Sequence, residues 1–261
     1  MKQWKLAYEL LSRFNAPVID NYYKLRCFPR ESAVQRVVSM DYGIEASSWH
    51  KMGKDAFGNT FCDGSCMEPH DEFRVSVDAV VERDPGPEPE ALAYIRLGLY
   101  RADTFLTAMG DELSHFYSSL RFSSDGSSWR RAGDIMSGLR DAFAYQSGVT
   151  GFDTTAEAAF RLGHGVCQDY AHIFLALCRH AGMTARYVAG IIPGEGATHA
   201  WVDVYEDGFW KGFDPTHGRE TDESYIAFST GTDAGMCVLN RGVFKKGMEI
   251  SQQVHVTMHE V

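Results

Sequence analysis

One cysteine of this chain lies where a thiol can act as a nucleophile. It belongs to the stretch LGHGVCQDYAHIFLALCRHAG, residues 162–182, between a glycine-flanked turn and a run with helical apolar spacing. This places Cys167 in the first helical turn, where unpaired backbone N–H groups and the helix dipole favour the thiolate. Gly163 and Gly165 allow a tight turn just ahead of it. The alternative is that Cys167 is a small buried apolar residue, as free cysteines commonly are.

The helix predicted from Cys167 onward is amphipathic, and Gly182 ends it. Asp169, His172 and Arg179 fall on the polar side, so we expect His172 at the helix surface. The apolar stripe consists of Tyr170, Phe174, Leu177, Cys178 and Ala181.

A thiol becomes a useful catalyst when an imidazole accepts its proton and a third group orients that imidazole. In THAWVDVYEDGFWKGFDPT, residues 198–216, the Asp-Gly pair predicts a hairpin with a two-residue turn, which places Asp214 opposite Trp201. His199 shares a strand face with Trp201, so His199 and Asp214 become diagonal neighbours within reach of a hydrogen bond. Taken singly, they could equally be a half-exposed strand histidine and a turn-forming aspartate.

The first part of the chain, residues 1–85, is predicted to form an antiparallel β-sandwich. The segments WKLAYEL, YKLRC and FRVSVDAVVE alternate apolar and polar residues, and DAFGNTF suits a hairpin. Composition changes at ERDPGPEPEAL, residues 82–92, where three prolines exclude a central strand. We place a domain boundary there.

Residues 91–247 are predicted to form an α+β domain. The segments DTFLTAMGDELSHFYSSL and RAGDIMSGLRDAFAY have helical spacing, and a short helix follows from Thr155. The segments RYVAGII, THAWVDVY and FWKGFD then read as strands, and helices followed by an antiparallel sheet define this class. Residues 248–261 alternate again and form a C-terminal strand that can pair with either sheet.

Composition excludes several classes of partner. The formal net charge is −10 and no polybasic run occurs, which argues against nucleic acid and anionic membranes. The N-terminal segment lacks the features of a signal peptide, and no segment is apolar enough to span a bilayer, so we expect a cytoplasmic protein. In that compartment the six cysteines remain thiols.

Three blocks of the chain resemble the signature segments of the transglutaminase-like superfamily. They are GHGVCQDYAHIFLALCRHAGMTARYVAG, THAWVDVY and WKGFDPTHG, in that order. YYKLRCFPRESAVQRVVSMDYGI and DAFGN resemble the N-terminal β-sandwich of the bacterial two-domain members. The resemblance implies a papain-like core whose catalytic triad is Cys167, His199 and Asp214.

The resemblance also implies acyl transfer through a thioester on peptide or isopeptide amides, without a cofactor. We expect hydrolysis of a peptide or protein substrate, because transfer to an amine needs a second binding site that excludes water. Amine transfer, as in a transglutaminase, and a non-catalytic peptide-binding module remain the alternatives. The backbone N–H of Cys167 is the predicted oxyanion donor, and Tyr145, Gln146 and Gln168 are candidates for a second. Trp201 either shields the imidazole or is a core aromatic.

Other groups of residues are weaker candidates. Cys62, Cys66 and His70 in CDGSCMEPH are soft ligands that could hold zinc if a fourth, such as Cys27, joined them; the preferred interpretation is a hairpin loop with incidental cysteines. The sequence fixes no carboxylate partner for His164, His172 or His217. No calcium-binding loop or phosphate-binding glycine motif occurs.

Overall fold

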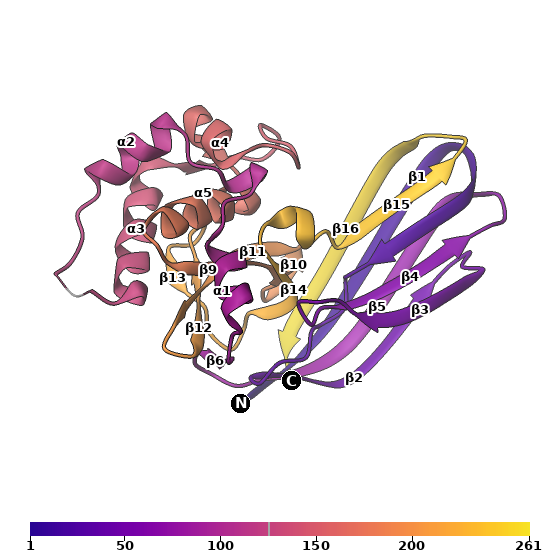
Figure 1. The fold of residues 1–261 in the computed structure, drawn as a ribbon. Coiled ribbons are helices and arrows are strands. Elements are labelled where there is room, and N and C mark those ends of the chain that lie inside the picture. Colours follow the sequence, from indigo (N-terminus) through magenta and orange to yellow (C-terminus); the bar gives the residue numbers. More distant parts are fainter. Residues whose placement is uncertain (125) are drawn as a thin grey trace.

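The computed structural model describes residues 1–124 and 126–261. Antiparallel sheets dominate it, and the helices gather at one end, around the second sheet (Figure 1).

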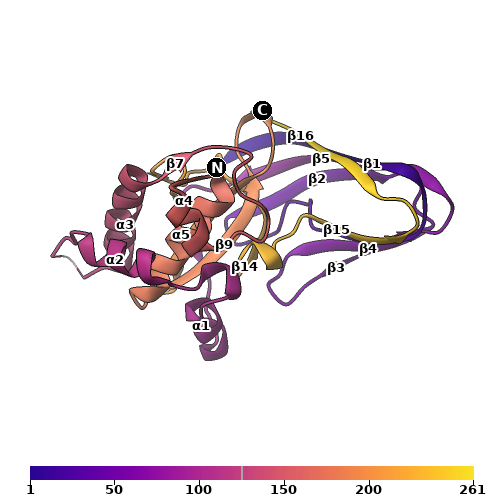
Figure 2. The ribbon, with the colours of Figure 1, turned by 90° about the horizontal axis from the view of Figure 1, so that it is seen from above.

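The first sheet is organised by one long strand, β1 (Lys2–Leu25), which contributes to two layers (Figure 2). Its first half pairs with β5 and β16, and its second half pairs with β4 and β15. The register shifts between Arg13 and Val18, where the strand passes from one layer to the other. The other long strands are β2 (Gln35–Ile44), β3 (Trp49–Lys54), β4 (Thr60–Cys66), β5 (His70–Arg83), β15 (Asn240–Lys245) and β16 (Glu249–Glu260), and the short strand β10 (Gly194–Gly196) completes the sheet.

The two layers enclose one hydrophobic core, as the alternating sequence predicts. Leu6 and Tyr8 of β1 are buried together with Val77 of β5 and Cys62 of β4. Side chains of a strand point alternately to opposite faces, so every second residue enters this core. Residues 55–59 join β3 and β4, which confirms the predicted hairpin.

Ion pairs with little exposure to solvent hold the proline-containing linker against the second sheet. Its short strand β6 (Glu88–Pro89) pairs with β12 at the sheet edge, where proline is tolerated. The Arg186 guanidinium donates to Asp203 Oδ2 at 2.9 Å, to Glu88 Oε2 at 3.0 Å and to Glu90 Oε2 at 3.0 Å. A buried charge is tolerated only when it is paired in this way.

Along the chain, most of the helices come before the strands of the second sheet. Its strand order is β13-β12-β11-β9-β14, and η2 (Ala234–Met236) leads the chain away from it. The strands are β9 (Thr184–Ile191), β11 (His199–Glu206), β12 (Phe209–Asp214), β13 (Arg219–Glu220) and β14 (Ile226–Gly231). The preceding elements are α1 (Tyr94–Arg101), η1 (Phe105–Thr107), α2 (Asp111–Ser119), α3 (Ser128–Ala142), β7 (Ala144–Tyr145), α4 (Ala156–Leu162), β8 (His164–Gly165) and α5 (Cys167–His180).

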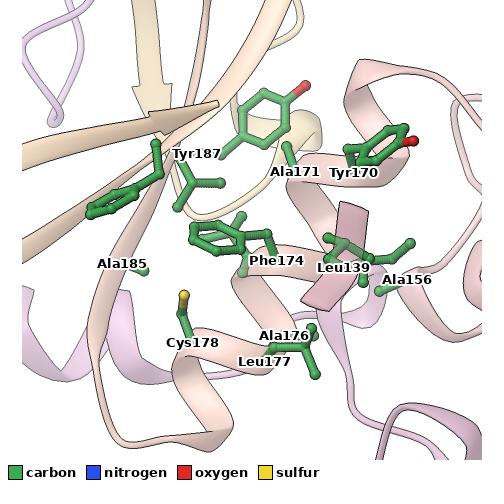
Figure 3. Packing of buried hydrophobic residues seen from close by; sticks show 14 of the residues in the cluster. Leu139, Ala156, Tyr170, Ala171, Phe174, Ala176, Leu177, Cys178, Ala185 and Tyr187 are labelled. Atoms are coloured by element: carbon green, nitrogen blue, oxygen red, sulfur yellow. The ribbon is translucent and has the colours of Figure 1, made fainter. Parts of the chain in front are cut away.

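Helix α5 is the centre of these helices, and it is buried on all sides. Figure 3 shows it packed against Ala185 and Tyr187 of the sheet and, on its other side, against Leu139 and Ala156 of neighbouring helices. The helix itself is present, but the prediction that one of its faces meets solvent is wrong, because the helix is buried over most of its length.

The polar residues of α5 are instead paired inside the protein. Arg179 donates to backbone oxygens of Tyr100, Ala185 and Thr232, so tertiary contacts replace water. His172 is fully buried rather than at the surface, and its Nε2 accepts the backbone N–H of Ala234 at 3.2 Å.

The C-terminal strand joins the two sheets. β16 pairs with β1 in the first sheet and with β10 (Gly194–Gly196), which lies in the loop between β9 and β11. The chain already returns to the first sheet at β15, inside the range 91–247 that was expected for the α+β domain. Within the described part of the chain, no helix is long and apolar enough to cross a membrane.

Asn59 provides a test of the contact between the two sheets. Its fully buried side chain donates to the backbone oxygen of Thr230 and accepts from the Thr230 N–H, both at 2.8 Å. Asn59→Ala leaves both backbone groups unpaired, so urea denaturation should show the free energy of unfolding lowered by about 1–3 kcal/mol. Asn15→Ala is the exposed control: its Oδ1 also accepts a backbone N–H, that of Met248 at 2.8 Å, but water can replace this bond, so the loss should stay below about 1 kcal/mol. Equal losses would contradict the buried contact.

Candidate active site

Cys167 is the first residue of α5, as predicted. The turn before it is held by Asp169, whose Oδ2 accepts the Val166 N–H at 2.8 Å and the Thr150 hydroxyl at 2.7 Å. Burial raises the pKa of Asp169. A Cβ at Gly165 would overlap the Asp169 side chain, so glycine is required there. Sequence reasoning placed Asp169 on the polar helix face, although its position three residues after the helix N-cap is where a capping carboxylate occurs.

His199 and Asp214 lie on the predicted hairpin. Glu206 pairs with Phe209 and Val202 pairs with Phe213, so the turn has two residues and the register is the expected one. His199 Nε2 lies 2.8 Å from Asp214 Oδ2. Sheet geometry alone therefore brings the imidazole and the carboxylate together.

The Asp214 carboxylate is fully buried and accepts several hydrogen bonds. Besides His199, its Oδ2 accepts from the Tyr225 hydroxyl at 2.8 Å and from His217 Nδ1 at 2.6 Å. Its Oδ1 accepts the N–H groups of Thr216 and His217 at 3.0 and 3.2 Å. Burial alone would raise the pKa of Asp214, but these donors, His199 foremost, hold it well below its usual range.

Sequence reasoning missed the two additional partners of Asp214. The sequence fixes no carboxylate partner for His217, but this residue follows Asp214 by three residues in a turn that closes on the carboxylate. A side chain of aspartate commonly accepts N–H groups two or three residues on, and this was the available signal. Tyr225 lies just before β14, and nothing in the sequence around Asp214 predicts that the Tyr225 hydroxyl contacts this carboxylate.

The His199 imidazole connects Asp214 to the thiol. With Nε2 donating to the carboxylate, Nδ1 is the nitrogen left for Cys167, and Cys167 and His199 line the same two cavities. Burial lowers the pKa of His199, yet the hydrogen bonds with Asp214 and Cys167 outweigh it and raise the pKa to about 9. The arrangement therefore favours a protonated imidazole beside the sulfur.

Trp201 packs behind the imidazole and is itself buried. Its ring is stacked on His199 with centroids 6.4 Å apart and meets Tyr225 edge-on at 5.3 Å. It thus shields the imidazole and belongs to a small core cluster at once. Gly190 on β9 leaves the space that the indole occupies.

Two cavities meet at the thiol, and both are lined by Cys167, Thr198 and His199. One, of about 460 Å³, also contains Tyr145 and His217, which keeps Tyr145 as a candidate oxyanion donor. Gln168 lines the other cavity, but its side-chain amide is already engaged, because its Nε2 donates to the Phe152 backbone oxygen at 3.1 Å. Gln146 lines neither cavity.

Cys62, Cys66 and His70, the weaker zinc alternative, do not form a metal-ligand cluster among the described residues. Cys62 and Cys66 lie buried within strand β4 rather than in a hairpin loop, and His70 hydrogen-bonds Asn21. Among the residues that the structure describes, the cluster with metal-ligand geometry is His199, Asp214 and His217. The hydrogen bonds of both imidazoles to one carboxylate oxygen already account for this cluster.

Comparison with known families agrees with this architecture. Residues 120–215 match the model of the transglutaminase-like superfamily, and residues 6–82 match that of the bacterial transglutaminase-like N-terminal region. The chain therefore belongs to the transglutaminase-like superfamily.

Similar proteins extend over nearly the whole chain. An uncharacterized protein of Mycobacterium tuberculosis is 25% identical over 281 residues, covering 95% of this chain and 90% of that protein. Another, from Mycobacterium leprae, is 23% identical and covers 84% and 85%. Among solved structures, the "Putative Cysteine Protease from Cytophaga hutchinsonii" has a TM-score of 0.81 at 17% identity, covering 100% of this chain and 91% of that one. That likeness shows a shared fold.

Gly190→Ala tests the support behind His199. The added Cβ would overlap the Ile226 backbone oxygen and the Trp201 indole, so the free energy of unfolding should fall by about 1–3 kcal/mol. Gly133→Ala in α3 is the control: no atom lies within 4 Å of its added Cβ, and helix propensity should stabilise it by up to about 1 kcal/mol. Chemical denaturation measures both. Equal signs for the two variants would contradict the packing described.

Proposed function

We propose that this protein is a thiol-dependent acyl-transfer enzyme acting on peptide or isopeptide amides, with Cys167, His199 and Asp214 as a catalytic triad. One observation carries the proposal: a buried imidazole hydrogen-bonds a fully buried carboxylate through Nε2 and lines the same two cavities as the helix-start thiol. Membership of the transglutaminase-like superfamily supports it. All three members of the triad would be dispensable in a module that only binds peptides.

The chemistry follows from the roles of these groups. The Cys167 sulfur attacks the amide carbonyl, the C–N bond breaks, and the imidazolium of His199 gives its proton to the leaving amine. The resulting thioester is then attacked by water, His199 accepts the proton of the water, and the free thiol returns as the acid is released. Asp214 holds the imidazole in the tautomer that leaves Nδ1 for the sulfur.

The oxyanion of each tetrahedral intermediate needs donors that are already in place. As the first residue of α5, Cys167 has a backbone N–H without an intrahelical partner, and this N–H is the first oxyanion donor in the proposal. The Tyr145 hydroxyl is the second donor in this proposal. The segment that carries it is tied to the Cys167 turn, because Gln146 N–H donates to the Gly165 oxygen at 2.8 Å.

Substitution of the triad tests the proposal with a panel of internally quenched peptides. Cys167→Ala should abolish turnover, and His199→Asn and Asp214→Asn should lower kcat by roughly 10²–10⁴-fold. Cys178→Ala, a buried thiol in the middle of the same helix, is the matched control and should retain activity.

A thiol-reactivity experiment separates an enzyme from a binding module. Iodoacetamide near neutral pH should modify Cys167 in preference to the buried thiols, and His199→Asn should slow that modification. Peptide cleavage that survives Cys167→Ala, or a Cys167 alkylation rate unaffected by His199→Asn, would contradict the triad.

Hydrolysis is the proposed outcome of the thioester, since water is abundant while an amine needs a second site that excludes water. A glutamine-containing peptide incubated with a labelled primary amine should therefore give free acid rather than labelled amide, as measured by mass spectrometry. Cys167→Ala provides the blank. Cys167-dependent incorporation of the amine as the main product would make the protein a transglutaminase instead.

A further inference from the structure

The two cavities that meet at Cys167 differ in character, and both lie where the two sheets join. The first has walls that include Gly194, Gly196 and His217, together with the apolar Ile192 and Pro193. The second, of about 330 Å³, is lined largely by apolar and aromatic side chains, among them Tyr187, Leu239 and Phe152, and also by the uncharged amides of Gln168, Asn240 and Gln252. A polypeptide lying across the thiol would therefore place residues on either side of its reacting amide in different surroundings.

Strand β16 of the first sheet contributes to both cavities. Gln252 and Val254 line the second cavity and Val256 lines the first. Alternate residues of a strand share a face, so one face of β16 runs past the thiol from one cavity to the other. Pairing of β10 with β16 at Gly196 and Val256 holds this strand beside the site (Figure 1).

The second cavity offers no formal charge other than that of the catalytic groups. No Asp, Glu, Lys or Arg is among the described residues that line it. Its two tyrosines, Tyr8 and Tyr187, are buried, and burial raises the pKa of each hydroxyl and keeps it neutral. A charged side chain entering here would lose its hydration, and among the described lining residues it would find no ionic partner besides the catalytic Cys167 and His199.

We propose that the second cavity is a specificity pocket for an uncharged, apolar side chain adjacent to the reacting amide of the substrate. The first sheet, through Val254, forms part of its wall, so the N-terminal region takes part in substrate choice. This inference rests on the proposed role of Cys167 as the nucleophile. Continuity of the cavity with the thiol identifies the occupant as substrate.

A pair of small electrophiles tests the pocket without requiring amide cleavage. N-chloroacetyl-leucinamide and N-chloroacetyl-glutamic acid α-amide each react as the Cys167 thiolate displaces chloride and forms a C–S bond. We expect the leucine probe to label Cys167 at least about tenfold faster, the low end of the gain from burying such a side chain. Peptide mapping by mass spectrometry gives the rates.

Two substitutions on β16 localise the effect. Val254→Lys places a cation in the pocket wall, so it should slow the leucine probe and accelerate the glutamate probe relative to the parent protein. Gln253→Lys makes the same charge change on the opposite face of the strand and should leave the ratio of rates unchanged. If Val254→Lys does not fold, Val254→Thr replaces it as the test. This variant keeps the branched shape, adds a hydroxyl to the pocket wall and should reduce the leucine preference.

The outcomes separate this inference from the proposed function. Selective labelling of Cys167 with equal rates for the two probes would overturn the pocket and leave the nucleophile intact. If Cys167 is not activated, the proposed function fails, and the pocket is judged by binding of the same molecules with acetyl in place of chloroacetyl. Absence of a leucine preference there would also overturn it.

Discussion

The structure around the thiol depends on one buried carboxylate. Asp214 carries its charge out of contact with water, and removing a carboxylate from water costs several kcal/mol unless donors replace the lost hydration. Donors from His199, His217 and Tyr225, with two backbone N–H groups, supply that replacement. The carboxylate in turn fixes the orientation of His199, whose imidazole lines the same cavities as the sulfur of Cys167.

The second constraint is that the last strand of the chain, β16, returns to the first sheet. β16 adds to the first sheet after the chain has completed the second, and β10 pairs with it. Because of this pairing, the loop between β9 and β11 is supported from the other sheet, and this loop leads directly into His199. The first sheet therefore helps to define the site, although the triad lies on other elements.

The hairpin of His199 and Asp214 could be predicted because its register depends only on local turn chemistry and on the two-residue period of a strand. The start of α5 at Cys167 could be predicted for the same reason, because it depends on residues close by in the sequence. The environment of α5 could not be predicted in this way, because the burial of His172 on its polar face depends on elements far away in the sequence. Tyr225 as a partner of Asp214 likewise requires the tertiary fold.

The central claim is that the carboxylate and the sulfur together hold a proton on His199. Nitrogen-15 NMR of histidine-labelled protein, with the resonance assigned by His199→Gln, measures this directly. The account predicts Nε2 protonated throughout and an apparent pKa of about 9 for the imidazole, which falls on Asp214→Asn. An imidazole that titrates near 6.5 in the intact protein, with no change on Asp214→Asn, would contradict it.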